Sequence, residues 1–164
     1  RFPYLRACLD EALRMYPAAP FINRRATSDV VLPRGGGADG QAPMLLRKGE
    51  EITFQLYVMH RREEYFGPNT EDFVPERWEY IKPGHAFSPF GGGRRMCIGR
   101  QFAYEETSYV TIRMVQHFST ISRVGNEPWV EALSALLANG RGTEVVLEPS
   151  TPAQTITATS EATV

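Results

Sequence analysis

One cysteine, Cys97, lies in a glycine-rich stretch whose residue types are suited to binding a metal. The stretch reads Phe90-Gly91-Gly92-Gly93-Arg94-Arg95-Met96-Cys97-Ile98-Gly99 and leads into a predicted helix. Cysteine binds metals as a thiolate, which a nearby arginine and the positive end of a helix both favour. Glycines let the backbone fold tightly around a bulky group. We therefore predict that Cys97 is a thiolate ligand of a metal.

Two other interpretations of this stretch are weaker. A glycine-rich loop can bind phosphate, but a phosphate loop continues with Gly-Lys-Ser/Thr, and this chain has Met96, Cys97 and Ile98 there. A lone cysteine is often an inert buried residue, which is how we interpret Cys8. Because Cys8 and Cys97 are the two cysteines of the chain, a disulfide framework is not indicated.

An amphipathic helix is predicted over residues 4–16. Its apolar residues recur at helical spacing and are Leu5, Leu9, Ala12, Leu13 and Tyr16, between Pro3 at the start and Pro17 at the end. Glu11 and Arg14 lie on the opposite face, three residues apart. By spacing alone, they would form a solvated ion pair worth about 0.2–0.5 kcal/mol.

Three motifs, in this order, resemble those of the haem-thiolate monooxygenases, the cytochrome P-450 family. Glu11 and Arg14 form a Glu-x-x-Arg pair, and residues 73–77 form a Phe-x-Pro-x-Arg segment that ends in Arg77. The pattern F-x-x-G-x-R-x-C-x-G is then filled by Phe90, Gly93, Arg95, Cys97 and Gly99. The resemblance covers roughly residues 2–118, although Trp78 stands where phenylalanine is commoner.

The resemblance implies a cofactor, haem b (iron protoporphyrin IX), with Cys97 as the axial ligand of the iron. Phe90 would shield the sulfur side of the ring, and Gly93 and Gly99 would let the loop approach it. Arg95 would bind one haem propionate through paired hydrogen bonds.

The resemblance also implies how the surrounding segments act. The second propionate would meet Arg24 or its neighbour Arg25, and the sequence leaves this choice open. His60 is either close to a propionate or a packing residue. The Glu-x-x-Arg pair and Arg77, that is Glu11, Arg14 and Arg77, would form a buried charge-assisted network that holds the meander beside the haem.

The activity implied by the resemblance is insertion of one oxygen atom from O2 into a C–H bond. Electrons would come from an NADPH-dependent reductase near the cysteine loop, where Arg94 and Arg100 either help docking or are simply solvated. Ala18, Ala19 and Phe21 lie on a segment that touches substrate in the family. The insert at residues 32–40 is similar to one in fungal members that hydroxylate alkanes and fatty acids, so a hydrophobic, long-chain aliphatic substrate is expected.

Family members are far longer than 164 residues, so we expect a C-terminal fragment. Residues 1–149 would be the haem-binding portion of one domain, and residues 150–164 a disordered tail. By resemblance, the full-length parent would lie at the endoplasmic reticulum membrane and be anchored by an N-terminal segment. We expect that segment to be absent from this chain, because no targeting or transmembrane segment is recognisable in its sequence. The alternative to a working monooxygenase is a truncated, non-catalytic chain that binds haem weakly or does not fold alone.

The predicted fold class is mainly α with small β-sheets (α+β). Strands are expected at residues 29–32 and 44–46 with a loop at 33–43 between them, then at 52–56 and 144–148. Residues 56–61 could also begin a short helix. A helix after Cys97 would bury Phe102, Ala103, Tyr109, Val110, Met114 and Phe118 on one face. A composition of 42% hydrophobic residues and a net charge of -1 fit a globular chain and argue against a nucleic-acid partner.

Overall fold

The computed structural model describes residues 2–150 and has an α+β fold with small sheets. Four antiparallel pairs of strands, β1–β4, β2–β3, β5–β8 and β6–β7, accompany the two longer helices α1 and α4. The predicted α+β class is therefore confirmed. The fold is not mainly α, however, because strands occupy as much of the described chain as α-helices do. Residues 151–164, most of the predicted tail, lie outside the described residues.

Helix α1 (Pro3–Met15) has Pro3 at its first turn and stops at Tyr16, directly before Pro17. Its buried side chains are Glu11, Arg14 and Met15. The apolar stripe predicted from the spacing is only half-buried. The solvated ion pair considered from the sequence is thus wrong, because the polar face of this helix is the one that the rest of the chain covers.

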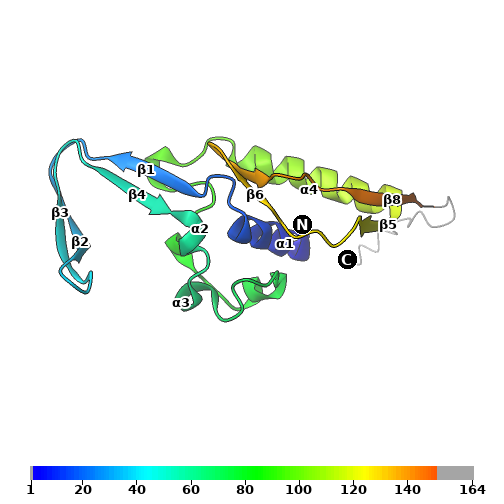
Figure 1. Ribbon diagram of the computed structural model, residues 1–164, viewed down its shortest axis with the longest axis horizontal. Coiled ribbons are helices and arrows are strands. Elements are labelled where there is room, and N and C mark those ends of the chain that lie inside the picture. The colour runs from blue at the N-terminus through cyan, green and yellow to red at the C-terminus, as the bar shows by residue number, and fades with distance from the viewer. Residues whose placement is uncertain (1, 151–164) are drawn as a thin grey trace, which may run out of the picture.

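Strand β1 (Phe21–Arg25) pairs with β4 (Glu51–Gln55), and β2 (Val30–Gly36) pairs with β3 (Ala42–Leu46) in the hairpin that extends from one end of the molecule in Figure 1. The glycine-rich insert is more ordered than predicted, since both strands run into it and leave residues 37–41 as the loop. Gly35 adopts φ +117°, and its amide donates to the carbonyl of Gly40, 2.9 Å away. Glycine permits this strand to continue where another residue would be strained.

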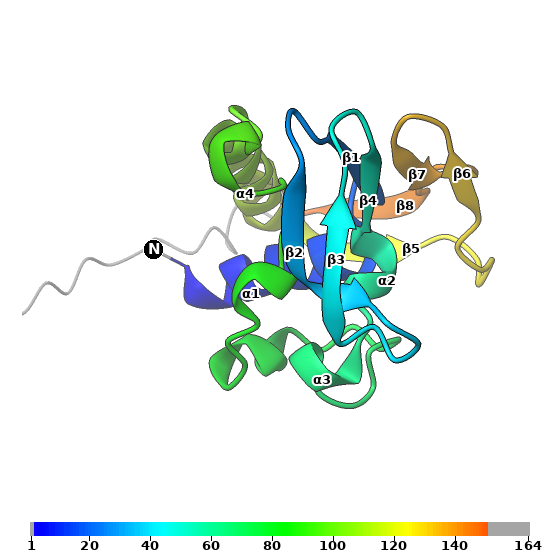
Figure 2. The ribbon, with the colours of Figure 1, turned by 90° about the vertical axis from the view of Figure 1, so that its left-hand side faces the viewer.

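A meander of short elements joins β4 to the cysteine stretch. It consists of α2 (Leu56–Met59), α3 (Glu63–Phe66), and the 3-10 turns η1 (Pro75–Glu79), η2 (Gly84–Ala86) and η3 (Gly93–Arg95). The open choice at residue 56 is settled in favour of a helix. In Figure 2, α3 lies at the bottom of the view, below the strands, whereas α2 lies higher, at the level of the strands.

Helix α4 (Arg100–His117) runs along the molecule to β5 (Phe118–Arg123), which pairs with β8 (Val145–Pro149) at the end opposite the β2–β3 hairpin (Figure 1). Between them, β6 (Glu131–Leu133) and β7 (Leu137–Asn139) form a small hairpin. The burial predicted for α4 is wrong: Phe102 and Tyr109 are 67% and 66% exposed, and Tyr104 is its buried side chain. Within residues 2–150, α1 packs on α4 at Tyr104, and the predicted face is only partly covered, since its other members Ala103, Met114 and Phe118 are half-buried and Val110 is exposed.

Candidate functional site

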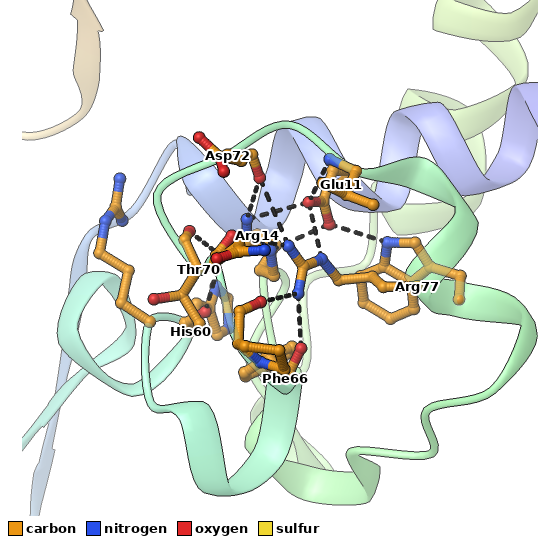
Figure 3. Close-up of polar contacts among 12 residues, drawn as sticks. Glu11, Arg14, His60, Phe66, Thr70, Asp72 and Arg77 are labelled. Carbon is orange, nitrogen blue, oxygen red and sulfur yellow. Dashed lines mark hydrogen bonds and ion pairs between the residues drawn. The ribbon is translucent and has the colours of Figure 1, made fainter.

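The centre of the core is the Glu11 carboxylate, which two guanidinium groups enclose (Figure 3). Arg14 donates to both carboxylate oxygens, each at 2.9 Å. Arg77 Nε donates to Oε1, also at 2.9 Å. All three side chains are buried, with at most 2% of each exposed. The structure therefore brings together the three residues of the predicted network.

Backbone carbonyls of the meander accept the remaining arginine hydrogens. Arg14 Nη1 donates to the carbonyls of His60 and Thr70, at 3.1 and 2.7 Å. Arg77 donates to carbonyls five to eleven residues earlier, those of Phe66, Pro68, Asn69 and Asp72. Because a guanidinium presents its donors in a rigid fork, the path of the chain from residue 60 to residue 77 is set by these two side chains.

The Glu11 carboxylate stays ionised although it is buried. Burial by itself would raise its pKa, but the hydrogen bonds from Arg14, the Val74 amide and Arg77 outweigh that effect and lower the pKa below its ordinary value. Trp78 adds a further donor, since its indole Nε1 lies 3.0 Å from Oε2. Phenylalanine, commoner at this position in the family that the motifs resemble, has no such donor.

His60 connects this network to the cysteine stretch. Its carbonyl accepts from Arg14, and its ring Nε2 accepts from the Ser88 amide at 3.2 Å. The carbonyl of Ser88 in turn accepts from the Gly91 amide at 2.8 Å. Of the two interpretations given to His60, its complete burial between the rings of Phe66 and Phe87 agrees with packing.

The His60 imidazole is held neutral. Burial lowers its pKa from 6.5 to about 4, in spite of nearby backbone groups of Arg14 and Leu13 that favour the charged form. Its Nδ1 is buried and has no hydrogen-bond partner among the described residues. A neutral ring in this position keeps Nε2 available as an acceptor for the Ser88 amide.

The cysteine stretch turns back on itself so that Cys97 lies next to Phe90. Gly91 and Gly93 have φ of +72° and +64°, a conformation that favours glycine. The Cys97 amide donates to the Phe90 carbonyl at 2.9 Å, which closes the turn. A Cβ at Gly99 would lie 3.8 Å from the Cys97 sulfur, so the backbone that starts α4 runs beside the thiol. The thiol itself is free and exposed.

Beside this turn lies a hollow of about 620 Å³. Its lining combines apolar side chains, such as Ile22 and Leu56, with the backbone of Gly92 and Gly93 and with the cation of Arg24. A Cβ at Gly91 would lie 3.8 Å from Arg24 Nη2, so this guanidinium reaches the cysteine turn itself. The arrangement offers an apolar surface, one positive charge and one thiol on neighbouring segments.

The geometry of β1 distinguishes Arg24 from Arg25, the two alternatives that the sequence left open for contact with the second propionate. Neighbouring residues of β1 point to opposite faces, so Ile22 and Arg24 share one face and Arg25 lies on the other. Arg25 is opposite Glu51 on β4 and forms an exposed ion pair with it. Arg24 is therefore the one that lines the hollow.

The other predicted residues are distributed around the turn. Arg94 and Arg95 are exposed in η3, and Arg95 makes no hydrogen bond or ion pair within residues 2–150. Arg100 is exposed in the first turn of α4. Phe90 packs its ring on Tyr104, with 5.3 Å between centroids. Phe21 faces a second hollow of about 350 Å³ beside Tyr57 and Leu137, away from Arg24.

Sequence reasoning missed several contributors to the site. Trp78 was noted only as a departure from the family, although it completes the shell of Glu11. Tyr104 was not named, although its hydroxyl donates to Asp10 on α1 at 2.6 Å. The carbonyls of Thr70 and Asp72 carry no side-chain signal at all, so no sequence pattern could have found them.

Comparison with known proteins agrees with the motifs. Residues 1–143 match the family profile described as Cytochrome P450. The chain is 44% identical to Cytochrome P450 monooxygenase fsdH of Fusarium heterosporum over 147 residues, which are 90% of this chain and 26% of that protein. It is 52% identical to Cytochrome P450 52C2 of Candida maltosa over 120 residues, 72% of this chain and 24% of that protein. The chain thus spans about a quarter of the length of these curated relatives.

Replacing the central carboxylate should destabilise the protein strongly. Glu11→Gln removes the charge that two buried guanidiniums share, so we expect it to lower the free energy of unfolding by roughly 3–5 kcal/mol. Chemical unfolding of the purified protein, followed by far-UV circular dichroism, measures the change. Glu79→Gln is the matched control, because Glu79 lies exposed on η1, and it should shift stability by less than about 0.5 kcal/mol. Similar stabilities of the two variants would contradict the role of the network.

Acid should weaken the fold before general acid unfolding begins. Between about pH 6.5 and 4, unfolded His60 takes up a proton and buried His60 does not. Lowering the pH through this range should therefore reduce the free energy of unfolding by roughly 3 kcal/mol, with full stability above pH 6.5. Glu11, whose pKa is lowered, adds a further loss below its ordinary value of 4.5.

Urea unfolding across this pH range tests the prediction. In His60→Asn, which keeps an acceptor for the Ser88 amide, the slope of stability against pH should be much smaller between about pH 6.5 and 4. The region above pH 6.5 serves as an internal control, where neither protein should change through this group. An equal slope in both proteins would show that His60 is not the group that takes up the proton.

Proposed function

This chain belongs to the cytochrome P450 family, and we propose that it holds haem iron through the Cys97 thiolate in a monooxygenase. The reaction is insertion of one oxygen atom from O2 into a C–H bond of a hydrophobic substrate. The observation that carries the proposal is the turn at residues 90–99. It presents an exposed thiol at the start of an 18-residue helix, next to a hollow with an apolar lining and one cation.

The residues around Cys97 fit a cofactor of this kind. Within residues 2–150 there is no group of three or more His, Cys, Asp or Glu side chains that could hold a metal ion, and the proposed cofactor is one that brings its own metal ligands. A porphyrin does so. Its apolar faces match side chains such as Ile22 and Leu56 of the hollow, and its acidic edge matches the guanidinium of Arg24.

When bound, thiolate-ligated haem iron supplies oxygen activation, because electron density from sulfur favours O–O cleavage. The residues of the chain would contribute to holding this cofactor in three ways. The amino-terminal end of α4 begins three residues after Cys97, so the turn delivers the sulfur to the start of a long helix. Arg24 and Arg95 are the proposed partners of the haem propionates. Phe90, whose ring packs on Tyr104 beside the turn, is the proposed shield of the sulfur side of the haem.

Further proposals concern partners and substrate. Arg94 and Arg100 are exposed next to Cys97 and would help an NADPH-dependent reductase to dock. The proposed substrate is a long-chain aliphatic molecule, an alkane or a fatty acid, and the insert at residues 32–40 supports it through its similarity to fungal members that hydroxylate such molecules. Ala18, Ala19 and Phe21 are the proposed substrate contacts.

For the parent protein we propose a location at the endoplasmic reticulum membrane. Among residues 2–150, no helix combines the length and the apolar character needed to cross a bilayer.

A second candidate concerns the 164-residue chain by itself. Exposed apolar side chains gather along α4 and the segment before it, and they include Ile98, Phe102, Tyr109, Val110 and Val115. A patch of this kind favours aggregation unless another element covers it. On this evidence the chain alone would be non-catalytic and bind haem weakly, and the monooxygenase activity would belong to a longer protein that contains it.

The spectrum of the reduced, carbon-monoxide-treated protein tests the ligand. We expect the red-shifted Soret band of thiolate ligation, and we expect Cys97→Ser to abolish it, because a serine hydroxyl does not ionise to replace the thiolate. Cys8→Ser is the matched control. Cys8 is half-buried in α1 and burial raises its pKa, so its replacement should leave the band in place. A band that survives in Cys97→Ser would refute the assignment.

The two arginines of β1 provide a test of the propionate contact. Arg24→Gln should speed haem loss roughly ten-fold, the size expected for one lost charge-assisted hydrogen bond. Arg25→Gln changes the neighbouring residue on the opposite face and should leave the rate unchanged. Transfer of haem to an excess of apomyoglobin measures both rates. Equal rates in the two variants would exclude Arg24 as a specific partner of the cofactor.

A further inference from the structure

A cluster outside the Glu11 network joins α1 to α4. Tyr104 is the buried side chain of α4, and its hydroxyl donates to Asp10 Oδ1 on α1 at 2.6 Å, across 94 residues of sequence. The other oxygen of Asp10 accepts from Arg6 Nε at 2.9 Å. One carboxylate thus holds both a phenol and a guanidinium.

The Tyr104 ring is held by its face as well as by its hydroxyl. The Arg6 guanidinium lies 3.5 Å from the ring centroid, the position of a cation–π contact. Burial raises the pKa of Tyr104, and the hydrogen bond to Asp10 adds to this, so the hydroxyl remains a donor at neutral pH. Both the place and the tilt of the ring are therefore determined by α1.

The same ring also supports the cysteine turn. Phe90 packs on it with 5.3 Å between centroids, and the Phe90 carbonyl accepts the Cys97 amide at 2.9 Å. Tyr104 also lines, with residues 89–93, a hollow of about 270 Å³ beside the turn. Tyr104 lies seven residues after Cys97, on the helix that directly follows the turn. It is therefore linked to the end of the turn through the backbone, and its ring contacts the beginning of the turn at Phe90.

We propose that Tyr104, fixed by Asp10 and Arg6, is a positioning residue for the Cys97 sulfur, an inference that rests on the proposed haem-thiolate function. The path runs from α1 through the phenol to Phe90, and from the Phe90 carbonyl to the Cys97 amide. It is separate from the path through His60 and Ser88, which reaches the turn at Gly91. Loss of the phenol hydroxyl should make the position of the Phe90 ring less well defined. The Cys97 sulfur should then be replaced as a thiolate ligand more often.

The test uses the haem-loaded protein and compares Tyr104→Phe with Tyr109→Phe. Both variants remove one phenol hydroxyl from α4, but Tyr109 is exposed and its hydroxyl makes no hydrogen bond within residues 2–150. The reduced carbon-monoxide complex is warmed mildly, and the rate is recorded at which the red-shifted thiolate band is replaced by the shorter-wavelength band of a neutral ligand. Haem content and far-UV circular dichroism are measured on the same samples.

For Tyr104→Phe we expect roughly ten-fold faster conversion, about 1.4 kcal/mol, with unchanged haem content and helicity. Tyr109→Phe should convert at the wild-type rate. Asp10→Ala removes the acceptor instead of the donor and should reproduce the effect of Tyr104→Phe, which keeps the inference testable if one variant folds poorly. If the Tyr104 ring only packed, Tyr104→Phe, which keeps the ring, would convert at the wild-type rate with unchanged helicity and haem content.

Wild-type conversion rates in both Tyr104→Phe and Asp10→Ala would overturn the inference and leave the proposed function standing. A wild-type protein that never shows the thiolate band would instead overturn the proposed function and the inference with it.

Discussion

The structure depends on one buried carboxylate that neutralises part of the positive charge of two buried guanidinium groups. Glu11 carries one negative charge against the two positive charges of Arg14 and Arg77, so the remaining charge must be balanced by dipoles. The carbonyls of the meander, including those of His60, Phe66, Thr70 and Asp72, supply them. Since burying an unbalanced charge is costly, any path of residues 60–77 that turned these carbonyls away would be strongly unfavourable. An irregular segment is thereby given one conformation without a regular hydrogen-bond ladder.

Helix α1 restrains the cysteine turn through two separate chains of contacts. On one side, Arg14 holds the His60 carbonyl, and the His60 ring holds Ser88 before the turn. On the other, Asp10 holds Tyr104, whose ring supports Phe90. The two routes reach the turn at different residues, so the backbone near Cys97 is restrained although few apolar side chains are buried around it. The position of Cys97, the proposed metal ligand, is then set by polar contacts rather than by a large core, which is consistent with the exposed thiol and the open hollow beside the turn.

Motifs in the sequence predicted the three charged residues of the network, because each carries a distinctive side chain at a fixed spacing. They could not predict the acceptors, since every residue has a carbonyl and only the fold decides which ones converge. The periodicity of α1 was misleading for a similar reason: hydrophobic spacing indicates an apolar stripe, yet the guanidinium network made the polar face the buried one. In α4 the predicted face is only partly covered within residues 2–150: Phe102, Tyr109 and Val110 are exposed, whereas Tyr104, which was not predicted to be buried, is the buried side chain.

The sequence by itself predicted the family and the α+β class, which the family profile and the structure confirm, and it singled out Cys97 as the proposed ligand. It could do so because glycine, cysteine, arginine and proline at fixed positions constrain chemistry and backbone locally. The tertiary structure alone decided that Arg24 and not Arg25 lines the hollow, that His60 is a neutral core residue, and that Tyr104 links α1 to the turn. Each of these depends on which face of an element meets a segment distant in sequence. Local patterns can name the two faces of a strand or helix, but only long-range packing decides which of them is covered.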